Sequence, residues 1–186
     1  MTLQWSIGLM TGTVNDGYID IVALRTDGSK VVEFGPFELY PYEDKEIKQL
    51  IFKTYEEAKK WNFEGPDPDI FSVTEKKITN EQSVAVEKFI HKYQLKKNDI
   101  ACVGFHGLTV LHKPFDLNSK YGKTRQLGNG QMMSNYLQLP VINDFRTNDI
   151  IHGGQGAPLA PIYHLALSKF IEEKNLVFLN IGGVSN

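Results

Sequence analysis

A glycine-rich segment near the start of the chain, residues 8–17 (GLMTGTVNDG), combines backbone freedom with side chains that could bind phosphate. Around Gly12, Thr11 and Thr13 can present successive backbone N–H groups and two hydroxyls to phosphate oxygens. Asp16 adds a carboxylate that could hold a Mg²⁺-bound water. The same residues also suit a tight hairpin turn that needs Gly and Asp for its dihedral angles. The sequence leaves both interpretations open.

A second segment, residues 144–158 (DFRTNDIIHGGQGAP), brings a cation, carboxylates and flexible backbone together. Arg146 follows an apolar run, and its planar guanidinium suits carboxylate or phosphate groups. The glycines after it allow a close backbone approach to a ligand. The alternative for Arg146 is an ion pair with Asp144 or Asp149.

Two further strand ends carry candidate residues. His106 lies between Gly104 and Gly107 after an apolar run, where it could be a base or a structural histidine with satisfied hydrogen bonds. Residues 179–186 (LNIGGVSN) place two glycines after another apolar run, which again frees backbone N–H groups to face an anion. We therefore expect a phosphate-binding turn there as well.

Other familiar chemistries fail on spacing. Residues 122–124 (GKT) imitate the end of a Walker A motif, but the position where its first glycine should stand is Leu117. The five histidines form no HExxH motif, and a single cysteine excludes a CxxC zinc site, so no structural metal is expected. A serine hydrolase remains a minor alternative, because the sequence at Ser185 matches only part of a nucleophile elbow.

Composition indicates a globular chain. Of the 186 residues 41% are hydrophobic and 23% charged, and the formal net charge is -2. Without a basic stripe, nucleic acid is an unlikely partner. Cys102 lies in an apolar run and has no second cysteine to pair with. No signal peptide and no apolar stretch near ~20 residues is present, so we expect a cytoplasmic protein without membrane contact.

The elements expected from the pattern alternate strands and helices. Strands are expected at 6–10, 19–24, 31–40, 99–105, 141–145 and 177–181, with 99–105 buried on both faces. Helices are expected at 44–61 and at 132–139. Two more are expected to begin at a capping box of Thr79 and Gln82 and at Pro158. This last helix should turn its apolar side chains inward: Leu159, Ile162, Tyr163, Ala166 and Phe170. The order predicts a mixed α/β lobe.

The chain resembles the anhydro-N-acetylmuramic acid kinases of bacterial cell-wall recycling. The resemblance rests on residues 8–17, on GFHGLTVLHKP at 104–114, on QLGNG at 126–130, on residues 144–158 and on LNIGGVSN. It implies an actin-like (ribonuclease H-like) mixed sheet with helices, forming the N-terminal lobe of a two-lobed sugar kinase. It also implies that ATP, Mg²⁺ and water convert 1,6-anhydro-N-acetylmuramic acid into N-acetylmuramic acid 6-phosphate.

The resemblance also implies the site residues. The ATP phosphates would contact a first loop made of Thr11, Gly12, Thr13, Val14, Asn15, Asp16, Gly17 and Tyr18, and a second loop that begins with Gly182 and Gly183. Asp16 would hold Mg²⁺ through water. The sugar site would contain His106, Gly107, Thr109, Arg146 and Asp149. Val14, Asn15 and Leu108 depart from the usual family pattern, which bears on the finer substrate contacts.

The resemblance further implies an incomplete kinase. The family's water-activating aspartate would lie beyond Asn186, so residues 1–175 are expected to form the N-terminal lobe, with 176–186 starting the other. This segment alone should be inactive, since positioning contributes roughly 7–11 kcal/mol to such reactions. The missing lobe would come from a second polypeptide, or the family homodimer would form. The alternatives are a non-catalytic sugar- or phosphate-binding lobe and another actin-like sugar kinase.

Overall fold

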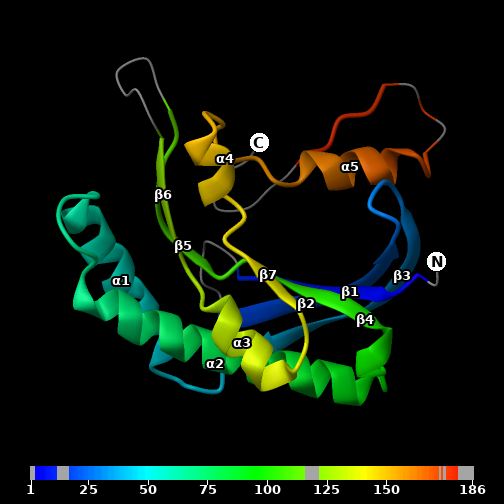
Figure 1. Ribbon diagram of the computed structural model, residues 1–186, viewed down its shortest axis with the longest axis horizontal. Coiled ribbons are helices and arrows are strands. Elements are labelled where there is room, and N and C mark those ends of the chain that lie inside the picture. Colours follow the sequence, from blue (N-terminus) through cyan, green and yellow to red (C-terminus); the bar gives the residue numbers. More distant parts are fainter. Residues whose placement is uncertain (1–2, 12–16, 116–121, 172, 174, 180–186) are drawn as a thin grey trace.

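The computed structural model describes residues 3–11, 17–115, 122–171, 173 and 175–179, and a five-stranded sheet lies at its centre (Figure 1). The strand order is β3-β2-β1-β4-β7. The strands are β1 (Trp5–Met10), β2 (Tyr18–Thr26), β3 (Val31–Pro41), β4 (Ile100–Phe105) and β7 (Val141–Asn143). The mixed α/β class predicted from the sequence is confirmed.

The sheet combines both strand directions. β1 pairs antiparallel with β2, and β2 with β3, whereas β1 pairs parallel with β4, and β4 with β7. The carboxyl ends of β1, β4 and β7 therefore meet at one edge, together with the start of β2. Ligands of open α/β sheets bind outside the carboxyl ends of the strands.

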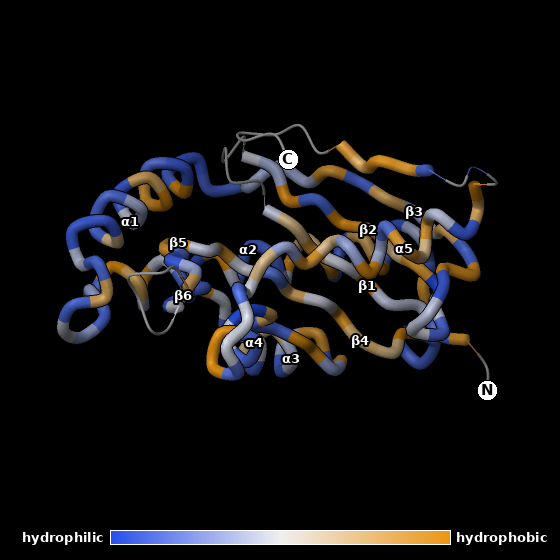
Figure 2. The backbone as a smooth tube through the Cα atoms, turned by 90° about the horizontal axis from the view of Figure 1, so that it is seen from above, coloured by the Kyte–Doolittle hydropathy of each residue, from blue (hydrophilic) through white to orange (hydrophobic). Residues whose placement is uncertain are grey.

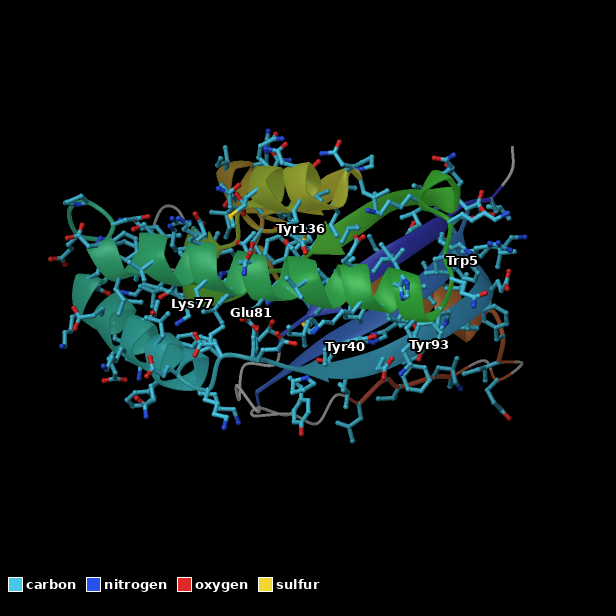
Figure 3. The ribbon with its side chains drawn as sticks, turned by 90° about the horizontal axis from the view of Figure 1, so that it is seen from below. Trp5, Tyr40, Lys77, Glu81, Tyr93 and Tyr136 are labelled. Atoms are coloured by element: carbon cyan, nitrogen blue, oxygen red, sulfur yellow. The ribbon has the colours of Figure 1, made fainter. Side chains whose placement is uncertain are left out.

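Two helices, α2 (Asp69–Lys92) and α3 (Gly130–Leu137), cover one face of the sheet, and α1 (Ile47–Trp61) packs beside α2. Figure 3 shows α2 running along the underside of the sheet. A short 3-10 turn (Lys97–Asp99) leads from α2 into β4. The core between these layers contains fully buried Phe71, Phe89 and Phe105 together with isoleucines of β1, β2 and the helices. Burial of such apolar surface is the main stabilising term.

α2 begins earlier than the sequence prediction. It starts at Asp69, directly after Pro68, so the predicted capping box of Thr79 and Gln82 is wrong. Both side chains lie inside the helix and are at most 1% exposed. The apolar face of the helix continues toward the N-terminus through Ile78 and Phe71. The helix extends no further than Pro68, because a proline clashes with the preceding turn of a helix.

A separate hairpin, β5 (Leu108–Lys113) with β6 (Lys123–Leu127), was not expected from the sequence. It contacts α1 and α2 on one side and α4 (Thr147–Ile151) on the other. Thr109 pairs with Gln126, and His112 with Thr124. Directly paired residues share a face of a sheet, so each pair projects to one side of the hairpin.

The last described helix, α5 (Pro161–Ser168), also departs from expectation. It begins at Pro161 rather than Pro158, and its side chains do not turn inward: Ile162 and Phe170 are 76% and 58% exposed, and Leu159 and Tyr163 are exposed too, whereas Ala166 is buried. The segment just after the helix reaches the sheet near its β3 edge, where the rings of Phe34 and Phe170 are 5.8 Å apart. A contact at the edge leaves the apolar side of the helix uncovered.

Two strand predictions also need correction. β4 was expected to be buried on both faces, but Ala101 is exposed and Cys102 half-buried, and the pairing of β4 with β1 is irregular at Ala101. Residues 177–179 form no strand, since no described residue pairs with them, and the rest of that prediction, 180–181, lies outside the described residues. A strand requires a neighbour to receive its ladder hydrogen bonds.

The face of the sheet opposite α2 is open and largely apolar. A cavity of about 370 Å³ is lined by Gly8, Val22, Phe37 and Gly104 among others. Figure 2, seen from above, shows hydrophobic residues along much of the strands and along α5. Phe37 on this face is 79% exposed. None of the described helices has the length and apolar character needed to cross a bilayer.

Candidate functional site

His106 and Arg146 meet at the edge formed by the carboxyl ends of the parallel strands. His106 follows β4 directly, and Arg146 follows β7 by three residues. His106 Nε2 lies 3.1 Å from Arg146 Nη2, and His106 Nδ1 lies 3.1 Å from the Gly107 carbonyl oxygen. A guanidinium can only donate and a carbonyl can only accept. The two contacts therefore require a neutral imidazole with its proton on Nδ1.

The environment of His106 favours that neutral form. Burial lowers the pKa of His106 below its ordinary 6.5, and the positive charge of Arg146 lowers it further, whereas the hydrogen bond to the Gly107 carbonyl acts in the opposite direction. Burial and the charge of Arg146 likewise lower the pKa of His112 on the hairpin, against the raising effect of a backbone hydrogen bond with Gln155. The site thus holds two imidazoles that resist protonation.

This arrangement predicts a loss of stability in mild acid. The unfolded chain binds a proton at His106 near pH 6.5 and the folded chain binds it only at lower pH. The contribution of neutral His106 to the free energy of unfolding is therefore fully present above about pH 6.5. It decreases as the pH drops toward the lowered pKa of the folded state. We expect His106→Gln to reduce the difference in unfolding free energy between about pH 8 and about pH 5.5, measured by urea titration.

The matched control for this prediction is His91→Gln, because His91 lies on the exposed side of α2. This control should leave the pH dependence as in the unsubstituted chain. The interpretation fails if both variants change the pH dependence equally, or if neither does.

Arg146 and Asp149 both bind the backbone of Gly156. Arg146 Nη1 donates to the Gly156 carbonyl oxygen at 2.7 Å, and Asp149 Oδ2 accepts from the Gly156 N–H at 2.7 Å. Within the described parts of the chain, no carboxylate oxygen lies within 4.0 Å of the Arg146 guanidinium, so the ion pair considered from the sequence does not form there. Asp144 instead accepts from the Thr147 hydroxyl at 2.7 Å. Among the described residues, no carboxylate thus forms an ion pair with the half-buried guanidinium of Arg146.

The hairpin brings Thr109 and Gln126 to the same site. Gln126 Nε2 donates to the His106 carbonyl oxygen at 3.2 Å, and Thr109 is the strand partner of Gln126. The predicted sugar-site residues therefore form one connected group, in which Thr109 joins through Gln126, and Asp149 joins through Gly156.

One stripe of α2 anchors two of the turns at this edge. Glu75 Oε1 accepts from the Gly128 N–H at 3.0 Å, and Thr79 Oγ1 accepts from the Asn129 N–H at 3.1 Å. Gln82 Nε2 donates to the Thr11 hydroxyl at 2.8 Å and to the Tyr42 hydroxyl at 2.9 Å. Positions i, i+4 and i+7 share one helix face. The predicted capping residues therefore serve as anchors.

The described ends of the first predicted phosphate loop are held in place. Thr11 is buried at 5% exposure, with its hydroxyl bound to Gln82. Gly17 has a φ of +93°, which favours glycine, and its carbonyl oxygen accepts from the Tyr42 N–H at 3.0 Å. A Cβ at Gly17 would lie 2.6 Å from Lys48 Nζ, so an ammonium group occupies the place of a side chain there. Tyr18 is 43% exposed at the start of β2.

The remaining predicted phosphate contacts lie outside the described residues: Gly12, Thr13, Val14, Asn15, Asp16, Gly182 and Gly183. The proposed Mg²⁺ position at Asp16 lies outside them as well. In the described ranges, no group of three or more His, Cys, Asp or Glu side chains could hold a metal ion.

Sequence reasoning missed three contributors to the site. Gln126 begins the QLGNG motif at 126–130, but no role was predicted for its side chain. A glutamine directly before a glycine-rich segment could have indicated one. Gln82 and Lys48 gave no local signal, because their contacts join elements that are distant in the sequence.

Comparison with known proteins supplies an independent finding. A family model described as anhydro-N-acetylmuramic acid kinase matches residues 4–186. Proteins named anhydro-N-acetylmuramic acid kinase from Brucella anthropi and Rhizobium rhizogenes are 48% and 46% identical over 183 residues, each covering 98% of this chain and 49% of the relative. A Jannaschia sp. protein named anhydro-N-acetylmuramic acid kinase 2 is 47% identical over 185 residues. The chain spans about half the length of the curated relatives it matches.

Proposed function

The chain belongs to the anhydro-N-acetylmuramic acid kinase family, and from this premise we propose that it is the sugar-binding N-terminal lobe of an ATP-dependent kinase. The proposed substrate is 1,6-anhydro-N-acetylmuramic acid. In the proposed reaction, water adds at C1 as the C1–O6 bond breaks, and O6 receives the γ-phosphoryl group of ATP. The products are N-acetylmuramic acid 6-phosphate and ADP.

The observation that carries this proposal is the Arg146 site. A half-buried guanidinium that forms no ion pair with any described carboxylate suits an acidic ligand, because charged groups removed from water need a partner. Arg146 is fixed by the Gly156 carbonyl and by neutral His106, so its orientation precedes ligand binding. We assign the sugar site to His106, Gly107, Thr109, Arg146 and Asp149.

The phosphate site is assigned to the turn between β1 and β2. The left-handed Gly17 with the Lys48 ammonium against it fits an anionic ligand. We propose that residues 11–18 bind the ATP phosphates together with Gly182 and Gly183, and that Asp16 holds Mg²⁺ through water. When bound, Mg²⁺ neutralises charge on the transferring phosphoryl oxygens.

We further propose that residues 1–175 are one lobe and that 176–186 begin the other. The matched relatives are about twice as long as this chain, so the half of their sequence without a counterpart here would supply the water-activating aspartate and the adenosine site. The same half would cover the open apolar face at Phe37 and Ile142, which are 79% and 53% exposed. Large exposed apolar patches mark interaction surfaces.

A chimera tests the proposed function. Residues 1–186 would replace the matched half of the Brucella anthropi relative, and ADP release would be measured with the anhydro sugar. We expect the chimera to transfer phosphate and the chain alone to be inactive, since positioning ATP against the acceptor contributes roughly 7–11 kcal/mol. If the chain binds the sugar but the folded chimera never transfers phosphate, it is a binding lobe and the kinase proposal is wrong.

A further inference from the structure

Three buried polar atoms around the Arg146 site lack a hydrogen-bond partner. Among the described residues, Thr109 Oγ1, Gln126 Oε1 and Arg146 Nε are buried and bond to nothing. An unsatisfied buried polar group costs about 1–3 kcal/mol. Three of them in one connected group indicate a site whose partner comes from outside the chain, because native interiors contain few such atoms.

Gln126 is the most constrained of the three. Its side chain is more than nine-tenths buried, at 8% exposure. The His106 carbonyl oxygen can only accept, so the Gln126 group facing it at 3.2 Å must be the NH₂. The amide oxygen then points away from His106, and an amide oxygen only accepts. Gln126 therefore presents a fixed acceptor that requires an O–H or N–H donor.

The other two atoms define the remainder of the ligand. Nη1 and Nη2 of Arg146 are used by Gly156 and His106, so Nε is a donor in need of an oxygen. Thr109 Oγ1 can donate or accept, and Thr109 lies directly opposite Gln126 in the hairpin. One fixed acceptor, one charged donor and one hydroxyl match a ligand that carries both N–H or O–H donors and acidic or hydroxyl oxygens. An N-acylated sugar acid has this set.

We propose that Gln126 is a substrate-binding residue whose Oε1 accepts a hydrogen bond from an amide N–H or hydroxyl of the sugar, beside Thr109 Oγ1 and Arg146 Nε. The proposal rests on the proposed function and extends it to a residue outside the predicted site. Gln126 would contribute specificity, because a site with an oriented buried acceptor disfavours ligands that lack the matching donor.

The test replaces Gln126 by methionine, which has a similar length and no hydrogen-bonding amide. Binding of the anhydro sugar to the chain is followed by NMR titration, which detects weak affinity. We expect Gln126→Met to weaken binding about tenfold or more, as loss of one such bond implies. The melting temperature should change little, since the variant removes an unsatisfied buried acceptor but also the hydrogen bond to the His106 carbonyl oxygen. Gln131→Met, on the exposed side of α3, is the control and should not alter binding.

Ligand variants identify the bonded group. The same titrations use an analogue in which an acetoxy group replaces the acetamido group, which keeps the carbonyl but removes the N–H donor. If Oε1 accepts the amide N–H, the unsubstituted chain prefers the acetamido sugar and Gln126→Met loses that preference. If Gln126→Met weakens both ligands equally, the donor is a hydroxyl that they share. Both results support the proposal.

Other outcomes overturn it. Equal affinity of Gln126→Met and the unsubstituted chain removes Gln126 from the binding site while leaving the proposed function standing. A lower melting temperature with unchanged affinity would give Gln126 a structural role only, through its bond to the His106 carbonyl oxygen. Failure of the unsubstituted chain to bind the sugar at all would contradict the proposed function and this inference together.

Discussion

Replacing Gly107 by alanine is expected to lower the free energy of unfolding by about 2–5 kcal/mol. Gly107 has a φ of +66°, a conformation that costs a residue with a Cβ about 1–2 kcal/mol. A Cβ there would also lie 2.2 Å from the Leu127 carbonyl oxygen and 3.1 Å from its carbon. Both are backbone atoms at the end of β6, so they cannot rotate away. Urea unfolding monitored by circular dichroism measures the loss.

Gly65→Ala is the matched control, because Gly65 has a similar φ of +75° and a methyl group there would meet nothing within 4 Å. It should lose only the conformational part, about 1–2 kcal/mol. The difference between the two variants isolates the contact with β6. Equal losses would show that the junction of β4 and β5 relaxes freely, contrary to the close packing of Gly107 against Leu127.

Arg146→Met is expected to weaken sugar binding about 100-fold, the largest effect on binding among the variants considered. A charge-assisted hydrogen bond contributes about 1.5–3 kcal/mol, and every 1.4 kcal/mol changes affinity about tenfold. The substitution removes the free Nε donor and also the contacts to Gly156 and His106 that shape the site. Loss of the positive charge should raise the pKa of His106, although burial still holds that pKa below 6.5.

Two further variants separate charge from general damage. Arg125→Met removes an arginine from the same hairpin, but Arg125 pairs with Asp67 at 2.7 Å, so sugar affinity should stay within about twofold. Arg146→Lys keeps the charge but loses the planar fork, and should lie between the unsubstituted chain and Arg146→Met. NMR of His106 reports its tautomer and pKa. Equal weakening by the Arg125 and Arg146 variants would refute a specific role for Arg146.

The sequence predicted the layers of the fold better than the residues at which the helices and strands begin and end. Strands β1 to β3 and helix α1 follow from alternation and from the spacing of apolar residues, which are local properties. The start of α2 was misplaced because Thr79 and Gln82 imitate a cap, whereas their polar atoms bond to Asn129 and Thr11. Such contacts between distant segments leave no local pattern.

Sequence reasoning could likewise identify some residues of the candidate site but not the contacts between them. His106 and Arg146 could be singled out because each follows a strand near glycines, and parallel strands bring such ends together. The free acceptor of Gln126, and the absence of an ion pair between Arg146 and any described carboxylate, are properties of the packed chain. Sequence reasoning offered Asp149 as a partner for Arg146, but the two side chains instead bind the carbonyl oxygen and the N–H of Gly156.

α2 binds two turns through side chains on one of its faces, those of Glu75, Thr79 and Gln82. Thr11 opens the turn assigned to phosphate, and Gly128 and Asn129 follow the strand that carries Gln126. Because α2 is one continuous helix of 24 residues, a shift along its axis displaces both turns in the same direction. Either turn can shift alone only by breaking its hydrogen bonds to α2. α2 therefore connects the turn proposed to bind phosphate with the turn beside the proposed sugar site.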